Sequence, residues 1–329
     1  MEKLKITGGQ PLNGTISISG AKNAALPLLA ATLLTDQPVT LGNVPALADI
    51  DSMVSLLTEL GAEIEPVKTL STMAHGPDIG RCYEITAATL SGSEATYDLV
   101  RKMRASVLVL GPLLARTGAA RVSLPGGCAI GNRPVDLHVK GLAALGAEVT
   151  LAGGYIEARA PACGYLTGGR VVFPVVSVGA TENIMMAATL ARGQTTMVNA
   201  AREPEIVDLA NCLRAMGAQI SGDGTDTIII DGVEQLHGCS HQVIADRIET
   251  GTFAIAAALT GGTVTLAGGR ADLIETVIDL LRQAGVAIDV GHQGLTVSAP
   301  AGGLQGVDVM TEPYPGFPTD LQAQMMVLM

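Results

Sequence analysis

A short pattern recurs along the 329-residue sequence and constrains the fold more than any other feature. In each copy an apolar helical stretch runs into a glycine, then a small residue, then a β-rich run; the glycines are Gly61, Gly146, Gly217 and Gly285. A glycine just after a helix C-terminus adopts positive φ at little cost, because it has no Cβ. The pattern therefore predicts four helices that each turn at once into a strand.

A further helix and a short strand precede each copy, and an alternating run typical of a hairpin follows it. The repeated unit is therefore strand, helix, strand, helix, strand, strand, which places the chain in the α/β class. The first helices of successive units are predicted to begin near Lys22, Arg104, Thr181 and Thr250.

A fifth unit is expected to begin near residue 320. Residues 317–320 resemble a helix N-cap and lead into an apolar stretch at 321–329, where the sequence stops without a following strand. On this pattern we expect a C-terminal truncation, with the unfinished part poorly folded, because the last helix lacks a sheet to pack on. The side chains expected to be exposed are Met325, Met326, Leu328 and Met329.

Composition narrows the class of protein. The sequence is 48% hydrophobic, but it has neither an apolar run long enough to cross a bilayer nor the pattern of a secretory signal. A net charge of −11 argues against nonspecific binding of nucleic acid. Five cysteines at irregular spacings fit reduced thiols of the cytoplasm better than a disulfide framework.

No metal site is expected. His237, Cys239 and His241 lie close together in the sequence, but a structural zinc site needs four ligands and no cysteine pair lies nearby. These residues are predicted to lie in a solvated loop.

Three segments carry side chains suited to chemistry. The first, residues 20–27, places Lys22 and Asn23 at the start of a helix, where an ammonium group, an amide and backbone N–H groups can meet one anion. A surface lysine beside an asparagine cap is the alternative. The third, residues 246–253, has acidic and basic side chains at the corresponding helix start, which form either a ligand site or an ion network.

The second segment, residues 124–138, is a glycine-rich loop that contains Cys128 and then Arg133. A cation near an exposed thiol favours the thiolate, so Cys128 is a candidate reactive residue. The alternative is a small buried hydrophobic side chain, which is the usual role of an isolated cysteine.

Seven segments resemble, in order, the motifs of the UDP-N-acetylglucosamine enolpyruvyl transferases, and the resemblance covers essentially the whole sequence. The related shikimate-pathway transferases share the repeated fold but are not expected to carry the PGGC…RPVDLH loop. The segments are GAKNAALP at 20–27, MRAS at 103–106, SLPGGCAIGNRPVDLH at 123–138, SVGAT at 177–181, AAREPEIVDLAN at 200–211, DRIETGTF at 246–253 and FPTDLQAQ at 317–324.

This resemblance implies transfer of the enolpyruvyl group of phosphoenolpyruvate to the 3′-hydroxyl of UDP-N-acetylglucosamine, with release of phosphate and without a cofactor. The reaction is the first committed step of peptidoglycan synthesis, in the cytoplasm. Cys128 matches the proton donor, which is also the target of fosfomycin; Lys22 matches a catalytic cation; Asp320 matches the residue that orients or deprotonates the 3′-hydroxyl. The other implied substrate-binding residues are Asn23, Arg104, Arg133, Pro134, Val135, Asp136, Leu137, Val175, Val176, Ser177 and Val178. Several family members carry lysine at the position of Val175.

The implied fold is an inside-out α/β barrel in two domains. One domain spans residues 22–243 with three complete units, and the other joins residues 1–21 to residues 244–329 and is truncated in its second unit. Two alternatives remain: a shikimate-type transferase, which the Cys128 loop argues against, and a noncatalytic remnant that at most binds a UDP-sugar.

Overall fold

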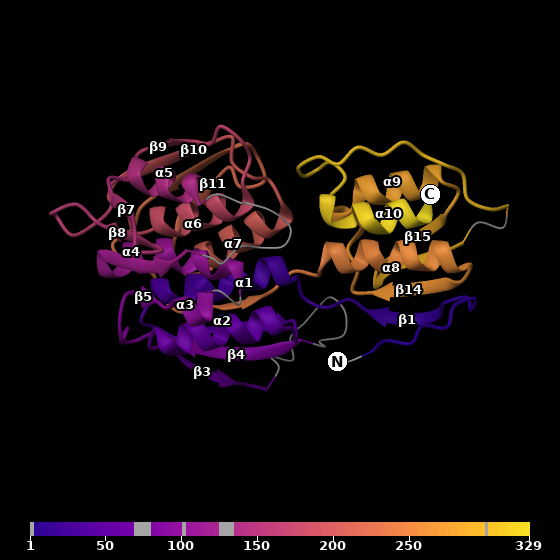
Figure 1. Ribbon diagram of the computed structural model, residues 1–329, viewed down its shortest axis with the longest axis horizontal. Coiled ribbons are helices and arrows are strands. Elements are labelled where there is room, and N and C mark those ends of the chain that lie inside the picture. Colours follow the sequence, from indigo (N-terminus) through magenta and orange to yellow (C-terminus); the bar gives the residue numbers. More distant parts are fainter. Residues whose placement is uncertain (1–2, 69–79, 101–102, 125–134, 300–301) are drawn as a thin grey trace. The chain divides into compact units, whose positions relative to one another are not determined.

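The computed structural model describes residues 3–68, 80–100, 103–124, 135–299 and 302–329. Contacts among these residues divide them into two units (Figure 1). The large unit holds the described residues from Gly20 to Ile244, and the small unit holds the described residues before Gly20 and after Ile244. Within the described residues the chain therefore passes between the units after Ser19 and after Ile244.

The described part of the large unit contains three four-stranded sheets, in the orders β13-β2-β4-β3, β5-β6-β8-β7 and β9-β10-β12-β11. In each sheet the first two strands pair parallel and the remaining pairs are antiparallel. The strands are β2 (Val39–Val44), β3 (Glu63–Pro66), β4 (Arg81–Thr86), β5 (Glu94–Ala95), β6 (Ala119–Ser123), β7 (Glu148–Ala152), β8 (Tyr155–Arg159), β9 (Arg170–Val172), β10 (Gln194–Val198), β11 (Gln219–Ser221), β12 (Thr227–Asp231) and β13 (Ser240–Gln242).

Helices that are buried on all sides form the core between these sheets (Figure 1). The most deeply buried are α1 (Lys22–Ala31), whose residues from Ala24 onward are all buried, and α6 (Val178–Ala188), buried from Ala180 onward. Such helices need cover on every side, which the sheets and the other helices supply. The remaining helical segments are η1 (Thr32–Leu34), α2 (Ala48–Glu59), α3 (Tyr97–Val100), η2 (Arg104–Val109), α4 (Leu110–Thr117), α5 (Asp136–Ala144) and α7 (Pro204–Ala215).

The small unit repeats the same strand arrangement in one sheet, with the order β1-β14-β16-β15. Its hydrophobic core lies between this sheet and its helices and includes Ile255, Leu266, Leu281 and Phe317. The strands are β1 (Asn13–Ser17), β14 (Thr263–Ala267), β15 (Ala287–Gly291) and β16 (Gly294–Ser298). The helical segments are α8 (Arg247–Thr260), η3 (Ala271–Leu273), α9 (Glu275–Gln283), η4 (Thr319–Leu321) and α10 (Gln322–Leu328). In the described parts of the chain, no helix has the length and apolar character needed to span a membrane.

β1 and β13 each pair in one unit, while the helix that follows each of them in the sequence lies in the other unit. β1 precedes α1 in the sequence but pairs with β14 of the small unit, and β13 precedes α8 but pairs with β2 of the large unit. By contrast, β5 and β9 join the sheets of their own repeats. The repeated unit is therefore strand, helix, strand, helix, strand, strand throughout, as predicted, with its first strand exchanged at the two crossings.

The glycine pattern is confirmed, since Gly61, Gly146, Gly217 and Gly285 all have positive φ just after a helix. Two predicted helix starts are three residues late: α6 begins at Val178 and α8 at Arg247. The preceding side chains explain the earlier starts, because Ser177 accepts a hydrogen bond from the N–H of Ala180, and Asp246 accepts from those of Ile248 and Glu249.

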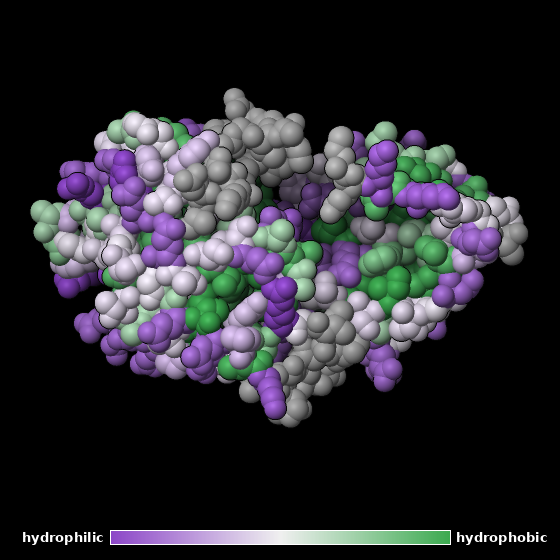
Figure 2. All heavy atoms as spheres, turned by 60° about the horizontal axis from the view of Figure 1, so that its bottom comes forward, coloured by the Kyte–Doolittle hydropathy of each residue, from purple (hydrophilic) through white to green (hydrophobic). Residues whose placement is uncertain are grey.

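The expectation for the last helix is wrong in part. Met325 and Leu328 are buried, because α10 packs on α8, where Gln324 Nε2 donates to Thr252 Oγ1 at 3.0 Å. Met326 and Met329 are exposed, as expected, and Figure 2 shows other hydrophobic side chains at the surface of the small unit.

Replacing Gly111 of α4 by alanine is expected to destabilise the large unit. The new Cβ would overlap the backbone carbonyl of Asn183 in α6, and two buried helices cannot separate without opening the core. We expect the free energy of unfolding to fall by about 2 kcal/mol or more, measured from urea unfolding. Gly92→Ala is the control: its Cβ would meet only the Glu94 nitrogen, at 3.9 Å, so similar losses in both variants would contradict the packing argument.

Candidate active site

Lys22 is the first residue of α1, and its Nζ lies 3.3 Å from Asp49 Oδ2 at the start of α2. The lysine side chain is 40% exposed, so this ion pair orients the ammonium group more than it stabilises the fold. The preceding Ala21 N–H donates to Ile244 O at 2.8 Å and fixes the helix start. Asn23 follows on the exposed side. Lys22 and Asn23 therefore lie in the first turn of a buried helix, which is the position that the sequence predicts.

The segment 175–178 lies at the start of α6. Val175 is 61% exposed and Val176 is partly exposed, while Ser177 caps the helix and Val178 begins it. The first N–H groups of a helix favour an anion, because they lack partners within the helix and lie at the positive end of its dipole. An exposed approach to such a helix start is a suitable site for a phosphate.

The start of α5 lies beside that of α6. Val135 precedes the helix, Asp136 begins it and Leu137 follows. Asp136 Oδ2 lies 3.3 Å from Lys140 Nζ, whereas its buried Oδ1 has no hydrogen-bond partner within the described residues.

Asn183 of α6 is hydrogen-bonded to two other helices inside the core. Its Oδ1 accepts from Gly111 N at 2.6 Å, and its Nδ2 donates to Val107 O at 2.9 Å. Nδ2 also lies 3.0 Å from Nδ1 of His138, which must accept, so the ring proton of His138 sits on Nε2. Asn183 thereby joins α6 to α5 and to the η2–α4 helix that Arg104 begins.

Several predicted site residues cannot be placed. Cys128, Arg133 and Pro134 lie outside the described residues, as does the side chain of Arg104. The described residues contain no group of histidine, cysteine and acidic side chains suited to a metal ion.

Asp320 belongs to the small unit, where it lies in η4 and is exposed. The third predicted segment also lies in this unit, at the start of α8. There Asp246 is the N-cap, and Glu249 Oε2 accepts from Ser19 N at 3.1 Å and from the Ser19 hydroxyl. Both acids therefore fix the helix start and its link to β1, while the guanidinium of Arg247 lies 5.8 Å from the ring centre of Tyr314.

Sequence reasoning missed three buried carboxylates near the start of α6. Glu182 of α6, together with Glu203 and Glu205 at the start of α7, each has one buried oxygen without a hydrogen-bond partner in the described structure. Burial, and then the charges of Glu205 and Glu203, raise the pKa of Glu182 well above its usual value. The two acids of the REPE stretch at 202–205 were the available signal, but only the fold brings Glu182 to them.

We predict that Glu182→Gln stabilises the large unit at neutral and alkaline pH. An acid with a raised pKa in the folded state contributes its full stability only below its unfolded pKa, near 4.5, and loses it as the pH rises toward the raised value. The amide resembles the protonated acid and has no such loss.

Urea unfolding from pH 5 to pH 8 tests this prediction. The difference in unfolding free energy between variant and native protein should grow with pH, by up to about 1.4 kcal/mol per pH unit. A difference that is constant over this range would show that Glu182 does not titrate as its burial implies.

Comparison with known proteins identifies the fold. A sequence model of the family described as EPSP synthase (3-phosphoshikimate 1-carboxyvinyltransferase) matches residues 6–329. The crystal structure of the enolpyruvyl transferase NikO from Streptomyces tendae superimposes with a TM-score of 0.81 at 24% identity, covering 98% of this chain and 73% of that one. An EPSP synthase from Acinetobacter baumannii gives 0.66 at 19% identity, covering 92% and 68%. The fold is that of the enolpyruvyl transferases, and the predicted α/β class is confirmed.

Relatives found by sequence are more similar to this chain than these two structures are. The UDP-N-acetylglucosamine 1-carboxyvinyltransferase of Rhodospirillum centenum is 61% identical over the whole of this chain, which covers 76% of that protein. The corresponding protein of Paramagnetospirillum magneticum is 56% identical, with 75% of its length covered. The chain therefore belongs to the UDP-N-acetylglucosamine 1-carboxyvinyltransferase family.

Proposed function

We propose that the protein transfers the enolpyruvyl group of phosphoenolpyruvate to the 3′-hydroxyl of UDP-N-acetylglucosamine and releases phosphate. The observation that carries this proposal is the 61% identity to a UDP-N-acetylglucosamine 1-carboxyvinyltransferase across all 329 residues. The reaction would be the first committed step of peptidoglycan synthesis, in the cytoplasm. The two units would correspond to the two family domains, residues 22–243 and residues 1–21 with 244–329.

Both substrates are anions, and the chain has a net charge of −11, so their binding requires local positive groups. The starts of α5 and α6 supply oriented backbone N–H groups, and Lys22 supplies an ammonium group. Phosphoenolpyruvate would bind at Lys22 and Asn23, with Arg104 and Arg133 as further cations.

The nucleotide would bind along Arg133–Leu137 and at Val175–Val178. Because Val175 stands where several family members carry lysine, the diphosphate would depend on the α6 helix start rather than on a side-chain charge. Asp136 Oδ1 has no hydrogen-bond partner among the described residues, which supports a polar contact of that residue with a ligand group.

The chemistry would proceed by addition and elimination. The 3′-hydroxyl oxygen forms a bond to the enol carbon of phosphoenolpyruvate while Asp320 accepts or orients the hydroxyl proton. Cys128 gives a proton to the methylene carbon. Loss of a proton from that carbon then expels phosphate and restores the double bond. Lys22 stabilises the charge that develops on the phosphate and carboxylate during both steps.

Lys22→Ala tests the proposal. Phosphate release from phosphoenolpyruvate with UDP-N-acetylglucosamine should be measured for the protein, for this variant and for the Rhodospirillum centenum relative as a positive control. We expect kcat/KM to fall about 100- to 1000-fold in the variant, because a preorganised cation acts mainly on the transition state.

Lys5→Ala is the control variant, since Lys5 is exposed and lies far from this helix in the sequence. Two results would contradict the proposal: phosphate release with shikimate 3-phosphate in place of the UDP-sugar, or no turnover by the protein under conditions in which the relative is active.

A further inference from the structure

Two thiols that the proposed reaction does not use lie together in the large unit. Cys212 is on the last turn of α7, and Cys239 immediately precedes β13. Their sulfur atoms are 4.0 Å apart, which is contact distance for two free thiols. A disulfide bond is about 2.05 Å long, so the sulfurs would have to approach by about 2 Å.

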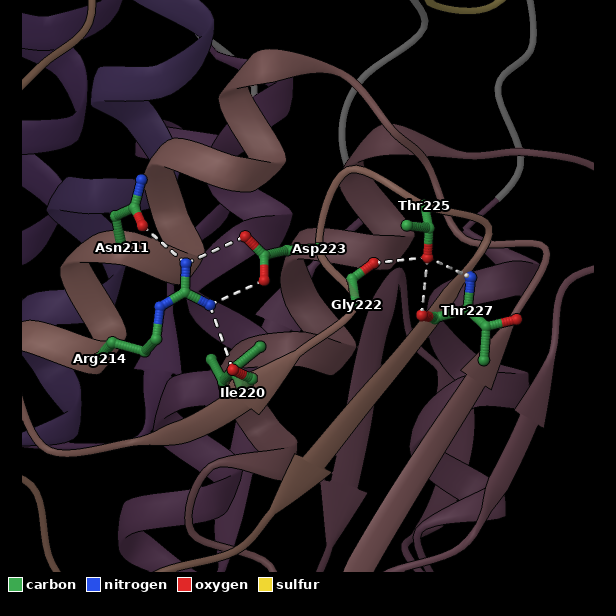
Figure 3. A network of polar contacts seen from close by, with 7 residues as sticks. All are labelled: Asn211, Arg214, Ile220, Gly222, Asp223, Thr225 and Thr227. Carbon is green, nitrogen blue, oxygen red and sulfur yellow. Dashed lines mark hydrogen bonds and ion pairs between the residues drawn. The ribbon is translucent and has the colours of Figure 1, made fainter.

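The backbone around each cysteine is fixed. Figure 3 shows the contacts that hold the end of α7. There Arg214 Nη1 lies 2.7 Å from Asp223 Oδ1, and Arg214 also donates to Asn211 Oδ1 and to Ile220 O, which binds the helix to β11 and the following turn. On the other side, Thr40 N of β2 donates to Cys239 O at 2.8 Å. With both elements held in this way, we expect the sulfurs to approach each other mainly by rotation of the two side chains.

The two thiols differ in access. Cys212 is fully buried in the core, whereas Cys239 is partly exposed. The hydrogen bond from Cys212, and then the nearby His241 and His237, lower the pKa of Cys239 to about 7. That hydrogen bond and burial raise the pKa of Cys212 well above its usual value. Cys239 is thus the thiol that an external reagent meets, and its lowered pKa favours the thiolate that attacks.

We propose that Cys212 and Cys239 form a site of reversible disulfide formation, with a small-molecule disulfide of the glutathione type as the oxidant. The Cys239 thiolate attacks one sulfur of the oxidant and releases the other half as a thiolate. Cys212 then gives up its proton to that thiolate and attacks the Cys239 sulfur, expelling the second half. Two protein thiols are oxidised, and one small disulfide is reduced to two thiols.

The crosslink would join α7 to the strand that leads back to the small unit. Asp208, one turn before Cys212 on α7, already binds this strand: its Oδ1 lies 2.9 Å from His241 Nε2, and its Oδ2 accepts from Ile244 N at 3.3 Å. Because the bond closes a long loop, we expect the oxidised large unit to melt about 5 to 10 °C higher than the reduced one.

The test is incubation of the native protein with oxidised glutathione at pH 7.5, followed by alkylation, digestion and mass spectrometry. We expect one crosslinked peptide pair containing Cys212 and Cys239, lighter by two hydrogens than its two parts and separated by dithiothreitol. In Cys212→Ala, Cys239 should stop at the mixed disulfide with glutathione. In Cys163→Ser, which removes an exposed cysteine, formation of the pair should be unchanged.

A native protein in which Cys239 keeps glutathione, or in which either cysteine pairs with another one, would overturn the proposal. So would a reaction confined to Cys163. The measurement on native protein decides without the variants, should one of them not fold. None of these outcomes depends on enolpyruvyl transfer, so the proposed function and this inference can fail separately.

Discussion

The large unit depends on helices that are buried on all sides. α1 and α6 expose almost no side chain beyond their first turn, so every side of each needs a partner. One sheet covers one side of a helix only, which is why three sheets with the same strand order surround the core. With their sides filled, these helices can offer only their ends to a ligand, and their starts carry Lys22 and the segment 175–178.

Asn183 is a fully buried polar side chain inside this core. A buried amide is costly unless all its groups are paired, and here its oxygen and both N–H groups have partners. Because those partners lie on α5 and on the η2–α4 helix, the amide fixes the positions of these two helices relative to α6. Close packing at Gly111, where α4 and α6 touch, has the same effect.

The repeated unit and the features set by neighbouring residues could be predicted from the sequence. Glycines at helix ends and the order of the unit follow from short patterns, and Lys22 lies at a helix start as its neighbours suggest. The two shifted helix starts were local features that the periodic pattern missed, since Ser177 and Asp246 cap N–H groups only two or three residues away. Contacts across sequence distance could not be predicted, such as the packing of α10 on α8 that buries Met325. The same limit hid Glu182 beside Glu203 and Glu205, and Cys212 beside Cys239, since neither set shares a motif.

At the two places where the chain passes between the units, after β1 and after β13, the backbone makes the same kind of hydrogen bond. In the small unit Asp246 N donates to Ser19 O, and in the large unit Ala21 N donates to Ile244 O, both at 2.8 Å. The outgoing and returning segments therefore pair with each other on both sides of the crossing. α1 begins directly after one crossing and α8 directly after the other. The backbone pairing that completes each sheet thus also sets where two helices start, and one of these starts carries Lys22.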